Sequence, residues 1–295
     1  SGEVEEAVRS FQDFAVREAS GFLDEVAVCA LRTALEQTDQ QRSRITELLR
    51  RLHEENILDQ ASLARGFAKL VCTWEDLVVD CGSKSSVYLV DMLLSCMRGN
   101  CVVRAFLMRL PEGLVMAVLR EGSEDEDKTE LQEVARKLQQ FKRGIQAAKL
   151  LQPPLPTVDL AAKVIQQQAM PECHHEFVKR ALQESVTWPP ALRRRCVALI
   201  GQLLEKGVLS REDIQWGVIR LLGQLEDLTL DCPNVAEVAA EHLRALQSKD
   251  LLPTSFVKRC RMLRVGGAAG LGVLEAALQP VGDAASAAKS PKGKV

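Results

Sequence analysis

The sequence predicts an all-α protein built from two copies of one helical unit, and three observations lead to this fold class. Apolar residues make up 46% of the 295 residues but aromatic residues only 4%, and Leu, Ala and Val dominate the apolar set. Such a composition, interspersed with Glu, Gln, Lys and Arg, is typical of packed helices rather than of sheets. Apolar residues also recur at helical spacing, and the sequence repeats itself at one offset.

The repeat appears when the sequence is compared with itself. A shift of 151 residues places residues 48–81 over residues 199–232 without a gap, with 11 identical residues in 34 positions. At this offset Gly66 aligns with Gly217. The acidic block at residues 75–81, which reads Glu-Asp-Leu and then Asp-Cys after two further residues, aligns with residues 226–232. Because the chain is long enough for two cores of ordinary size, we expect two domains.

The apolar pattern within each copy is helical. Leu63, Phe67 and Leu70 lie at positions i, i+4 and i+7, and the same stripe recurs over residues 214–222. Short polar breaks such as 56–59 separate successive helices, so neighbouring helices must pack antiparallel as hairpins.

Composition shifts indicate where the copies begin and end. An acidic run at Gly122–Asp127 predicts a turn, a helical stretch follows, and the prolines between 153 and 156 cannot continue that helix. The Gly- and Ala-rich end has few large apolar groups and is expected to be disordered. The predicted parts are a first helical domain (1–120), an acidic turn with a helical linker and a Pro-rich boundary (121–156), a second helical domain (157–265) and a disordered tail (266–295).

Charge and cysteine usage exclude several classes of protein. The formal net charge of -2 gives no field strong enough to draw the chain onto nucleic acid or an anionic membrane. No run of 18 apolar residues and no signal-peptide pattern is present, so no membrane contact is expected. The nine cysteines form no CxxC pair, which argues against a zinc cluster or a disulfide framework and favours the cytoplasm or the nucleus.

No catalytic motif is found. The sequence has no Gly-rich phosphate loop, no GxSxG and no HExxH, so we expect a binding protein rather than an enzyme, with no cofactor and no small-molecule substrate. Glu172–Glu176 contains metal-ligand residue types, but consecutive residues of a helix point about 100° apart and cannot converge on one ion. We expect these residues on a helix surface, with one histidine packed against a neighbour and no metal bound.

The duplicated acidic block is the best candidate for a binding site. In each copy, two aspartates at i and i+4 flank a leucine, and burial of that leucine would fix the carboxylates as a two-pronged acceptor for Arg or Lys. The acidic blocks comprise Glu75, Asp76 and Asp80 in the first copy, and Glu226, Asp227 and Asp231, followed by Pro233, in the second.

A structural interpretation of the same residues remains open. Asp80 and Asp231 come just before a predicted helix, where aspartate accepts hydrogen bonds from unpaired backbone N–H groups, and Pro233 suits a first helical turn. Capping does not account for Asp76 and Asp227, which lie four residues earlier.

Two local patterns carry a resemblance to a known family. Residues 76–80 and 227–233 resemble the acidic-Leu-x-Leu-Asp-x-Pro loop of MA-3 domains, and His174–Leu182 resembles an early helix of the same domain. The resemblance extends over most of residues 4–118 and 157–264. It implies an all-α fold of two tandem HEAT-like domains of antiparallel helical hairpins, joined here by a helical linker.

The resemblance also implies a partner and a function. In MA-3 domains the loop carboxylates bind the DEAD-box RNA helicase initiation factor 4A, so two domains are expected to hold the two lobes of the helicase and to inhibit translation initiation. The partner-binding residues that the resemblance implies are Glu75, Asp76, Asp80, Glu226, Asp227, Asp231 and Pro233. Pro233 matches the family proline whereas Gly82 replaces it in the first copy, so the first loop is expected to be looser.

Two other functions remain open. The chain could be a HEAT-like scaffold for another protein, with purely structural loops. It could also be an RNA-binding adaptor that uses the basic clusters Arg193–Arg195 and Lys258–Arg264. Because no aromatic residues are interleaved with these clusters, a solvated helix face is the stronger interpretation of them.

Overall fold

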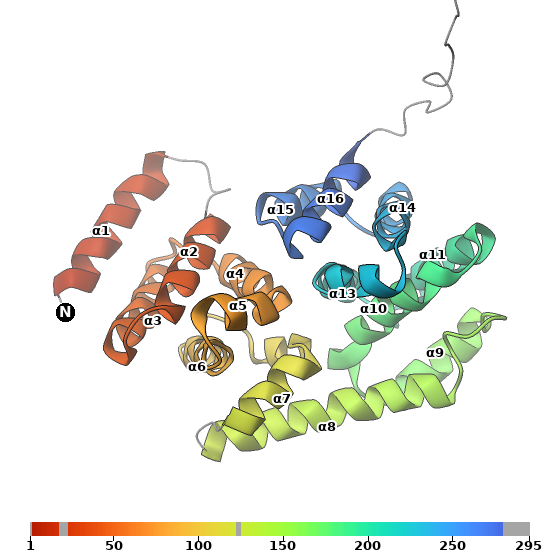
Figure 1. The fold of residues 1–295 in the computed structure, drawn as a ribbon, viewed down its shortest axis with the longest axis horizontal. Coiled ribbons are helices and arrows are strands. Elements are labelled where there is room, and N and C mark those ends of the chain that lie inside the picture. Colours follow the sequence, from red (N-terminus) through yellow and green to blue (C-terminus); the bar gives the residue numbers. More distant parts are fainter. Residues whose placement is uncertain (1, 18–22, 122–124, 280–295) are drawn as a thin grey trace, which may run out of the picture.

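The computed structural model describes residues 2–17, 23–121 and 125–279, and every regular element in these ranges is a helix (Figure 1). The predicted all-α fold of two repeats is confirmed. The first repeat contains α1 (Gly2–Arg17), α2 (Leu23–Leu35), α3 (Asp39–Glu54), α4 (Gln60–Cys72), α5 (Trp74–Cys81), α6 (Ser85–Arg98), the 3-10 helix η2 (Arg104–Arg109) and α7 (Glu112–Glu121).

The second repeat follows a similar order, with two additional short 3-10 helices and with α15 at the position of η2. It contains α9 (Val158–Gln167), η3 (Pro171–Cys173), α10 (His174–Glu184), η4 (Ser185–Thr187), α11 (Pro190–Glu205), α12 (Arg211–Leu222), α13 (Leu225–Asp231), α14 (Val235–Ser248), α15 (Thr254–Met262) and α16 (Gly267–Leu278). No helix in the described ranges is long and apolar enough to cross a membrane.

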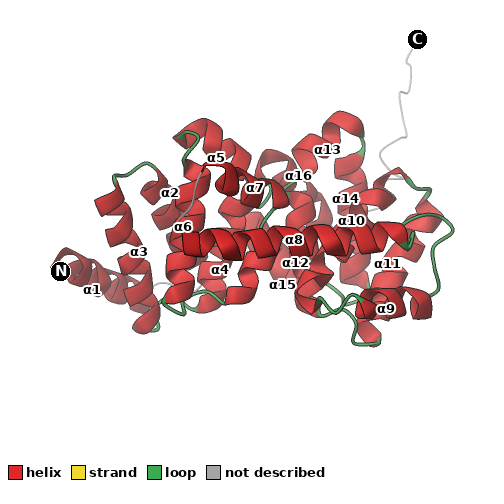
Figure 2. Ribbon diagram, turned by 90° about the horizontal axis from the view of Figure 1, so that it is seen from below, coloured by secondary structure: helices red, strands yellow, loops and turns green. Residues whose placement is uncertain are grey.

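Helix α8 (Asp125–Ala147) connects the repeats and runs along both of them (Figures 1 and 2). It contacts α7 and η2 of the first repeat and α9, α10 and η3 of the second. The sequence predicts a turn over Gly122–Asp127, but residues 125–127 belong to the first turn of α8. Residues 122–124 lie outside the described ranges.

The duplication is visible in the packing of individual residues. A Cβ atom added to Gly66 of α4 would lie 2.7 Å from Ala27 Cβ of α2, and one added to Gly217 of α12 would lie 2.6 Å from Val178 Cβ of α10. These two contacts are related by the same 151-residue shift. In each repeat, glycine lets two helices cross more closely than any side chain would allow.

The turns that separate the helices are duplicated too. Asn56 and Gly207 have positive φ angles of 57° and 67° just after α3 and α11, which is how helices commonly end. Asp59 and Ser210, three residues later, then cap α4 and α12 with their side chains. Local chemistry therefore sets the same hairpin in both repeats.

The end of the described chain differs from the expectation. The sequence predicts disorder from residue 266 onward, whereas Gly267–Leu278 forms α16, which packs on α14 and α15. Val273, Leu274 and Ala277 are buried, so a few aliphatic side chains supply enough apolar contact when a neighbouring helix is close. Residues 280–295 lie outside the described ranges.

The expectation of a surface helix at residues 172–176 is wrong. His174, His175 and Glu176 are all buried, because α10 packs against both α8 and α12. Burial lowers the pKa of His175 to about 3. Burial would raise the pKa of Glu176, but the adjacent cations Lys179, Lys142 and Arg220 lower it to about 2. Glu176 is therefore a buried, charge-compensated carboxylate.

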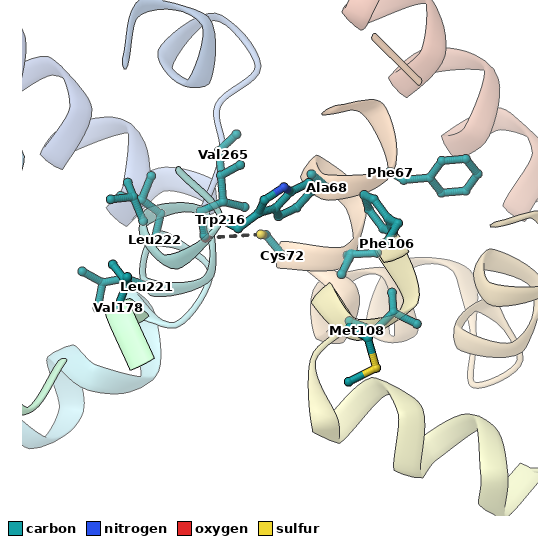
Figure 3. Close-up of a cluster of buried hydrophobic side chains, with 14 of the residues drawn as sticks. Phe67, Ala68, Cys72, Phe106, Met108, Val178, Trp216, Leu221, Leu222 and Val265 are labelled. Carbon is teal, nitrogen blue, oxygen red and sulfur yellow. Dashed lines mark hydrogen bonds between the residues drawn. The ribbon is translucent and has the colours of Figure 1, made fainter. Parts of the chain in front are cut away.

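The two repeats share one continuous core (Figure 3). The Trp216 ring of α12 meets the Phe106 ring of η2 edge to face, with 5.1 Å between centroids. Cys72 of α4 donates its thiol hydrogen to the Ile219 carbonyl oxygen across 3.4 Å, and Lys69 Nζ donates to the Arg264 carbonyl oxygen. These contacts fix the position of one repeat relative to the other.

Candidate partner-binding site

The candidate carboxylates lie on two short helices, α5 and α13, rather than on loops. The first turn of each helix contains the acidic pair, Glu75 and Asp76 in α5 and Glu226 and Asp227 in α13, where the helix dipole favours negative charge. Helix α5 ends at Cys81 and is followed by Gly82, whose φ of 92° is strained for any other residue and impossible for proline. This difference in backbone explains why the proline of the second copy has no counterpart in the first.

Each helix is attached to the core by two apolar positions. In α5, Leu77 is buried and Trp74 half-buried; in α13, Leu225 is buried and Leu228 half-buried. Trp74 and Leu225 are equivalent in the repeat, as are Leu77 and Leu228. The sequence-based expectation of a buried leucine between the carboxylates thus holds for Leu77 but only partly for Leu228.

All six carboxylates are exposed. Asp80 Oδ2 lies 3.3 Å from Arg32 Nη2, a surface pair in which both side chains stay more than half exposed and which contributes little to stability. The capping interpretation is not supported, because Asp80 and Asp231 occupy the last turns of their own helices. The N-cap residues of α6 and α14 are Lys84 and Asn234, and neither forms a side-chain capping bond. Pro233 is an exposed residue of the short α13–α14 connection and precedes the first turn of α14.

The acidic first turns of the two repeats face one cleft. Glu75, Asp76, Glu226 and Asp227 line it together with residues at the ends of α4 and α12, and its volume is about 110 Å³. Burial, and then repulsion by Asp227 and Asp76, raise the pKa of Glu75 above its usual value. Buried Arg220 of α12 also lines the cleft, so four carboxylates face one cation and the cleft keeps an excess of negative charge to which both repeats contribute.

An apolar residue stands beyond each acidic pair, and sequence reasoning did not identify it. Val79 and Leu230 are 84% and 85% exposed, whereas the other exposed large apolar side chains in the described ranges reach at most 50%. They occupy equivalent positions, since 230 − 79 = 151. If residues 74–81 are assigned to a helix, the spacing predicts that Val79 is exposed, because it lies off the face formed by Trp74 and Leu77.

Both helices lie along the same edge of the molecule (Figure 2). Each presents an aspartate, an exposed apolar side chain and a second aspartate within five residues. Within the described residues, no group of three or more His, Cys, Asp or Glu side chains is arranged to hold a metal ion. The surface is therefore suited to a protein partner that combines basic and apolar side chains.

The fold and this surface define a class: all-helical proteins of two tandem repeats, each presenting one acidic and apolar helix. Comparison with known families matches residues 1–102 and 157–253 to the MA3 domain. These ranges cover more than half of the chain, which belongs to the MA3 domain family.

Two plant proteins are similar to this chain. MA3 domain-containing translation regulatory factor 2 of Arabidopsis thaliana is 26% identical over 242 residues, which cover 76% of this chain and 34% of the relative. MA3 domain-containing translation regulatory factor 4 of the same plant is 29% identical over 104 residues, 35% of this chain and 16% of that relative. The chain is a distant homologue of translation regulatory factors and spans about a third or less of their length.

Proposed function

We propose that this protein regulates translation initiation by binding the DEAD-box RNA helicase initiation factor 4A through α5 and α13, and that it inhibits the helicase. The observation that carries the proposal is the duplicated surface of α5 and α13. In both repeats two carboxylates flank an apolar side chain that is more than four-fifths exposed. Membership of the MA3 domain family and the names of the two relatives support a role in translation.

The physical basis is a combination of charge and apolar contact. Carboxylates attract and orient the basic side chains of a partner, while Val79 and Leu230 lose contact with water when the partner covers them. The carboxylates are held on helices anchored to the core, so little conformational entropy is lost on binding.

The two repeats bind more tightly together than either alone. Their relative position is fixed by the shared core, so once one helix binds, the other is held close to the same partner. A partner held at two places by a rigid protein cannot change the relative position of its own lobes freely. Because a DEAD-box helicase must move its lobes to unwind RNA, such binding inhibits unwinding.

The two alternatives receive less support. A generic scaffold is expected to present its main apolar surface on a concave helical face, yet in the part of the chain that the structure describes the most exposed large apolar side chains are Val79 and Leu230. For RNA binding, Arg193 is only 14% exposed and pairs with Glu241, and Arg259 lies 3.6 Å from Asp24. Both basic clusters are thus partly neutralised.

Charge reversal in the second repeat tests the proposal. We expect the double substitution Asp227→Lys with Asp231→Lys to weaken binding of purified initiation factor 4A at least about tenfold in a calorimetric titration. It should also remove the inhibition of RNA unwinding. Glu237→Lys, an exposed charge reversal on the neighbouring helix α14, is the matched control and should leave binding unchanged.

Circular dichroism separates binding from folding in this experiment. The proposal requires the melting temperature of the double variant to stay close to that of the unmodified protein, since both carboxylates are exposed. If binding and helical structure are lost together, the residues have a structural role. If binding persists, the helicase does not contact α13.

A further inference from the structure

The second aspartate of each acidic helix meets a different neighbour in the two repeats. In the first repeat, Arg32 of α2 places its Nη2 atom 3.3 Å from Asp80 Oδ2 at the end of α5. The 151-residue shift relates Asp80 to Asp231 and Arg32 to Gln183, a half-buried, neutral residue of α10. Among the residues that the structure describes, none forms an ion pair with Asp231. Only Asp80 therefore has a cation beside it.

Helices α2 and α10 occupy equivalent positions in the structure as well as in the sequence. Helix α2 packs on α4 through the close crossing at Gly66, and α10 packs on α12 through the matching crossing at Gly217. Both helices thus approach the acidic helix of their repeat in the same arrangement. The exchange of Arg32 for Gln183 is a difference in chemistry at one position of a shared fold.

Both aspartates lie where a carboxylate benefits from a cation. Asp80 and Asp231 are in the last turns of α5 and α13. Carbonyl groups without a partner give a helix C-terminus partial negative charge, which disfavours a carboxylate and favours a basic side chain. Arg32 supplies that basic side chain to Asp80 from within the chain. In the described part of the second repeat, no side chain does the same for Asp231.

The ion pair with Arg32 is not what holds α5 in place. The side chains of Arg32 and Asp80 are 56% and 55% exposed, and a pair so open to water contributes little to stability. Buried Leu77 and half-buried Trp74 attach the helix to the core instead. Removing the Arg32 guanidinium should therefore free the Asp80 carboxylate without moving α5.

We propose that Arg32 competes inside the chain with the partner's basic side chains, and that this makes the first repeat the weaker of the two binding sites. Arg32 occupies Asp80 in the free protein, so a partner cation gains only the difference between its own attraction to Asp80 and that of Arg32. The second repeat, in which Asp231 is unpaired, is the stronger site. This inference rests on the function proposed for α5 and α13, and it ranks the affinities of the two helices.

Calorimetric titration of the full chain with purified initiation factor 4A at low salt tests the inference. Arg32→Gln gives the first repeat the residue that the second repeat already has. We expect this variant to bind the helicase about two- to fivefold more tightly, the range that corresponds to one exposed ion pair. Gln183→Arg, the reciprocal change, should weaken binding by a similar factor. Arg9→Gln removes the same charge from an exposed position of α1 and should leave the affinity unchanged.

A double-mutant cycle assigns the effect to Asp80. In an Asp80→Asn background the acceptor is absent, so Arg32→Gln should no longer change the affinity. The melting temperatures of these variants should match that of the unmodified protein, since both side chains are exposed.

Three results would overturn the inference while leaving the proposed function intact. Weaker binding by Arg32→Gln would show that Arg32 orients Asp80 for the partner. Unchanged affinity would show that the pair does not compete with the helicase. Tighter binding that persists in the Asp80→Asn background would reflect net charge alone. If the unmodified chain does not bind the helicase at all, the proposed function fails and this inference fails with it.

Discussion

Val79 and Leu230 lie 151 residues apart at equivalent positions of the two repeats, and both are almost fully exposed between two aspartates. An isolated exposed apolar side chain needs no explanation, but the same exposure at the same position of two diverged copies is informative. Neither side chain helps to hold the fold together. Their positions fit a surface that is covered by a partner.

Replacing both residues separates binding from stability. Because their side chains make few contacts, Val79→Ser combined with Leu230→Ser should change the free energy of unfolding by less than about 0.5 kcal/mol. The affinity for initiation factor 4A should fall about tenfold or more, since an apolar anchor is lost in each repeat. Urea unfolding and calorimetry measure the two effects, and a large loss of stability would show that these residues are structural.

The close helix crossings predict a strong effect of one methyl group. In Gly217→Ala the new Cβ would lie 2.6 Å from Val178, so α10 and α12 must separate, and we expect a loss of about 1–3 kcal/mol in unfolding free energy. Gly272→Ala in α16 is the control, because nothing lies within 4 Å of its added Cβ. That substitution should stabilise the protein by up to about 1 kcal/mol. Equal effects of the two changes would contradict the packing described for the crossing.

The buried histidines predict loss of stability in mild acid. Burial lowers the pKa of His175 to about 3 and that of His242 to about 4, against about 6.5 in an unfolded chain. Between pH 6.5 and 4 the unfolded state therefore binds more protons than the folded state, so stability falls as the pH falls. Each histidine contributes a slope of up to about 1.4 kcal/mol per pH unit.

Urea unfolding at pH 6.5, 5.5 and 4.5 measures this slope. In His242→Gln the slope should decrease by the contribution of one proton, although the protein is less stable throughout because the bond between Ser185 Oγ and His242 Nε2 changes. An unchanged slope would mean that His242 binds protons equally in the folded and unfolded states, which contradicts the lowered pKa.

The acidic cleft predicts that one carboxylate favours binding at the expense of stability. Partial burial and the nearby Asp227 and Asp76 raise the pKa of Glu75, so its charged form is disfavoured in the unbound protein. Glu75→Gln should therefore leave the melting temperature unchanged or slightly higher, while it weakens binding to initiation factor 4A. Scanning fluorimetry and calorimetry at low salt test this, and a lower melting temperature would contradict it.

The sequence was sufficient to predict helices, the repeat and the acidic positions, because these depend on local spacing and on residues that recur. The 151-residue offset placed Asp76 with Asp227 and Asp80 with Asp231 without any coordinates. It also indicated that Gly66 and Gly217 have the same role, which the structure identifies as a close helix crossing.

Features that depend on tertiary contacts were not predictable in the same way. Helix α16 is rich in Gly and Ala and forms because α14 offers a partner surface. His174 is buried against Phe141 of the connecting helix α8, and buried His175 lies near Arg220 of α12 and Arg109 of η2. The convergence of Glu75 and Asp227 on one cleft results from how the repeats pack, and no spacing within either repeat indicates it.

The central claim is that both α5 and α13 touch initiation factor 4A, and site-specific photocrosslinking tests it most directly. A benzophenone amino acid is placed at Val79, at Leu230, or at Leu160, an exposed apolar residue of α9 that serves as the control. After irradiation with purified helicase, the account predicts covalent adducts from positions 79 and 230 and none from 160. Absence of adducts at 79 and 230, or equal adducts at 160, would contradict it.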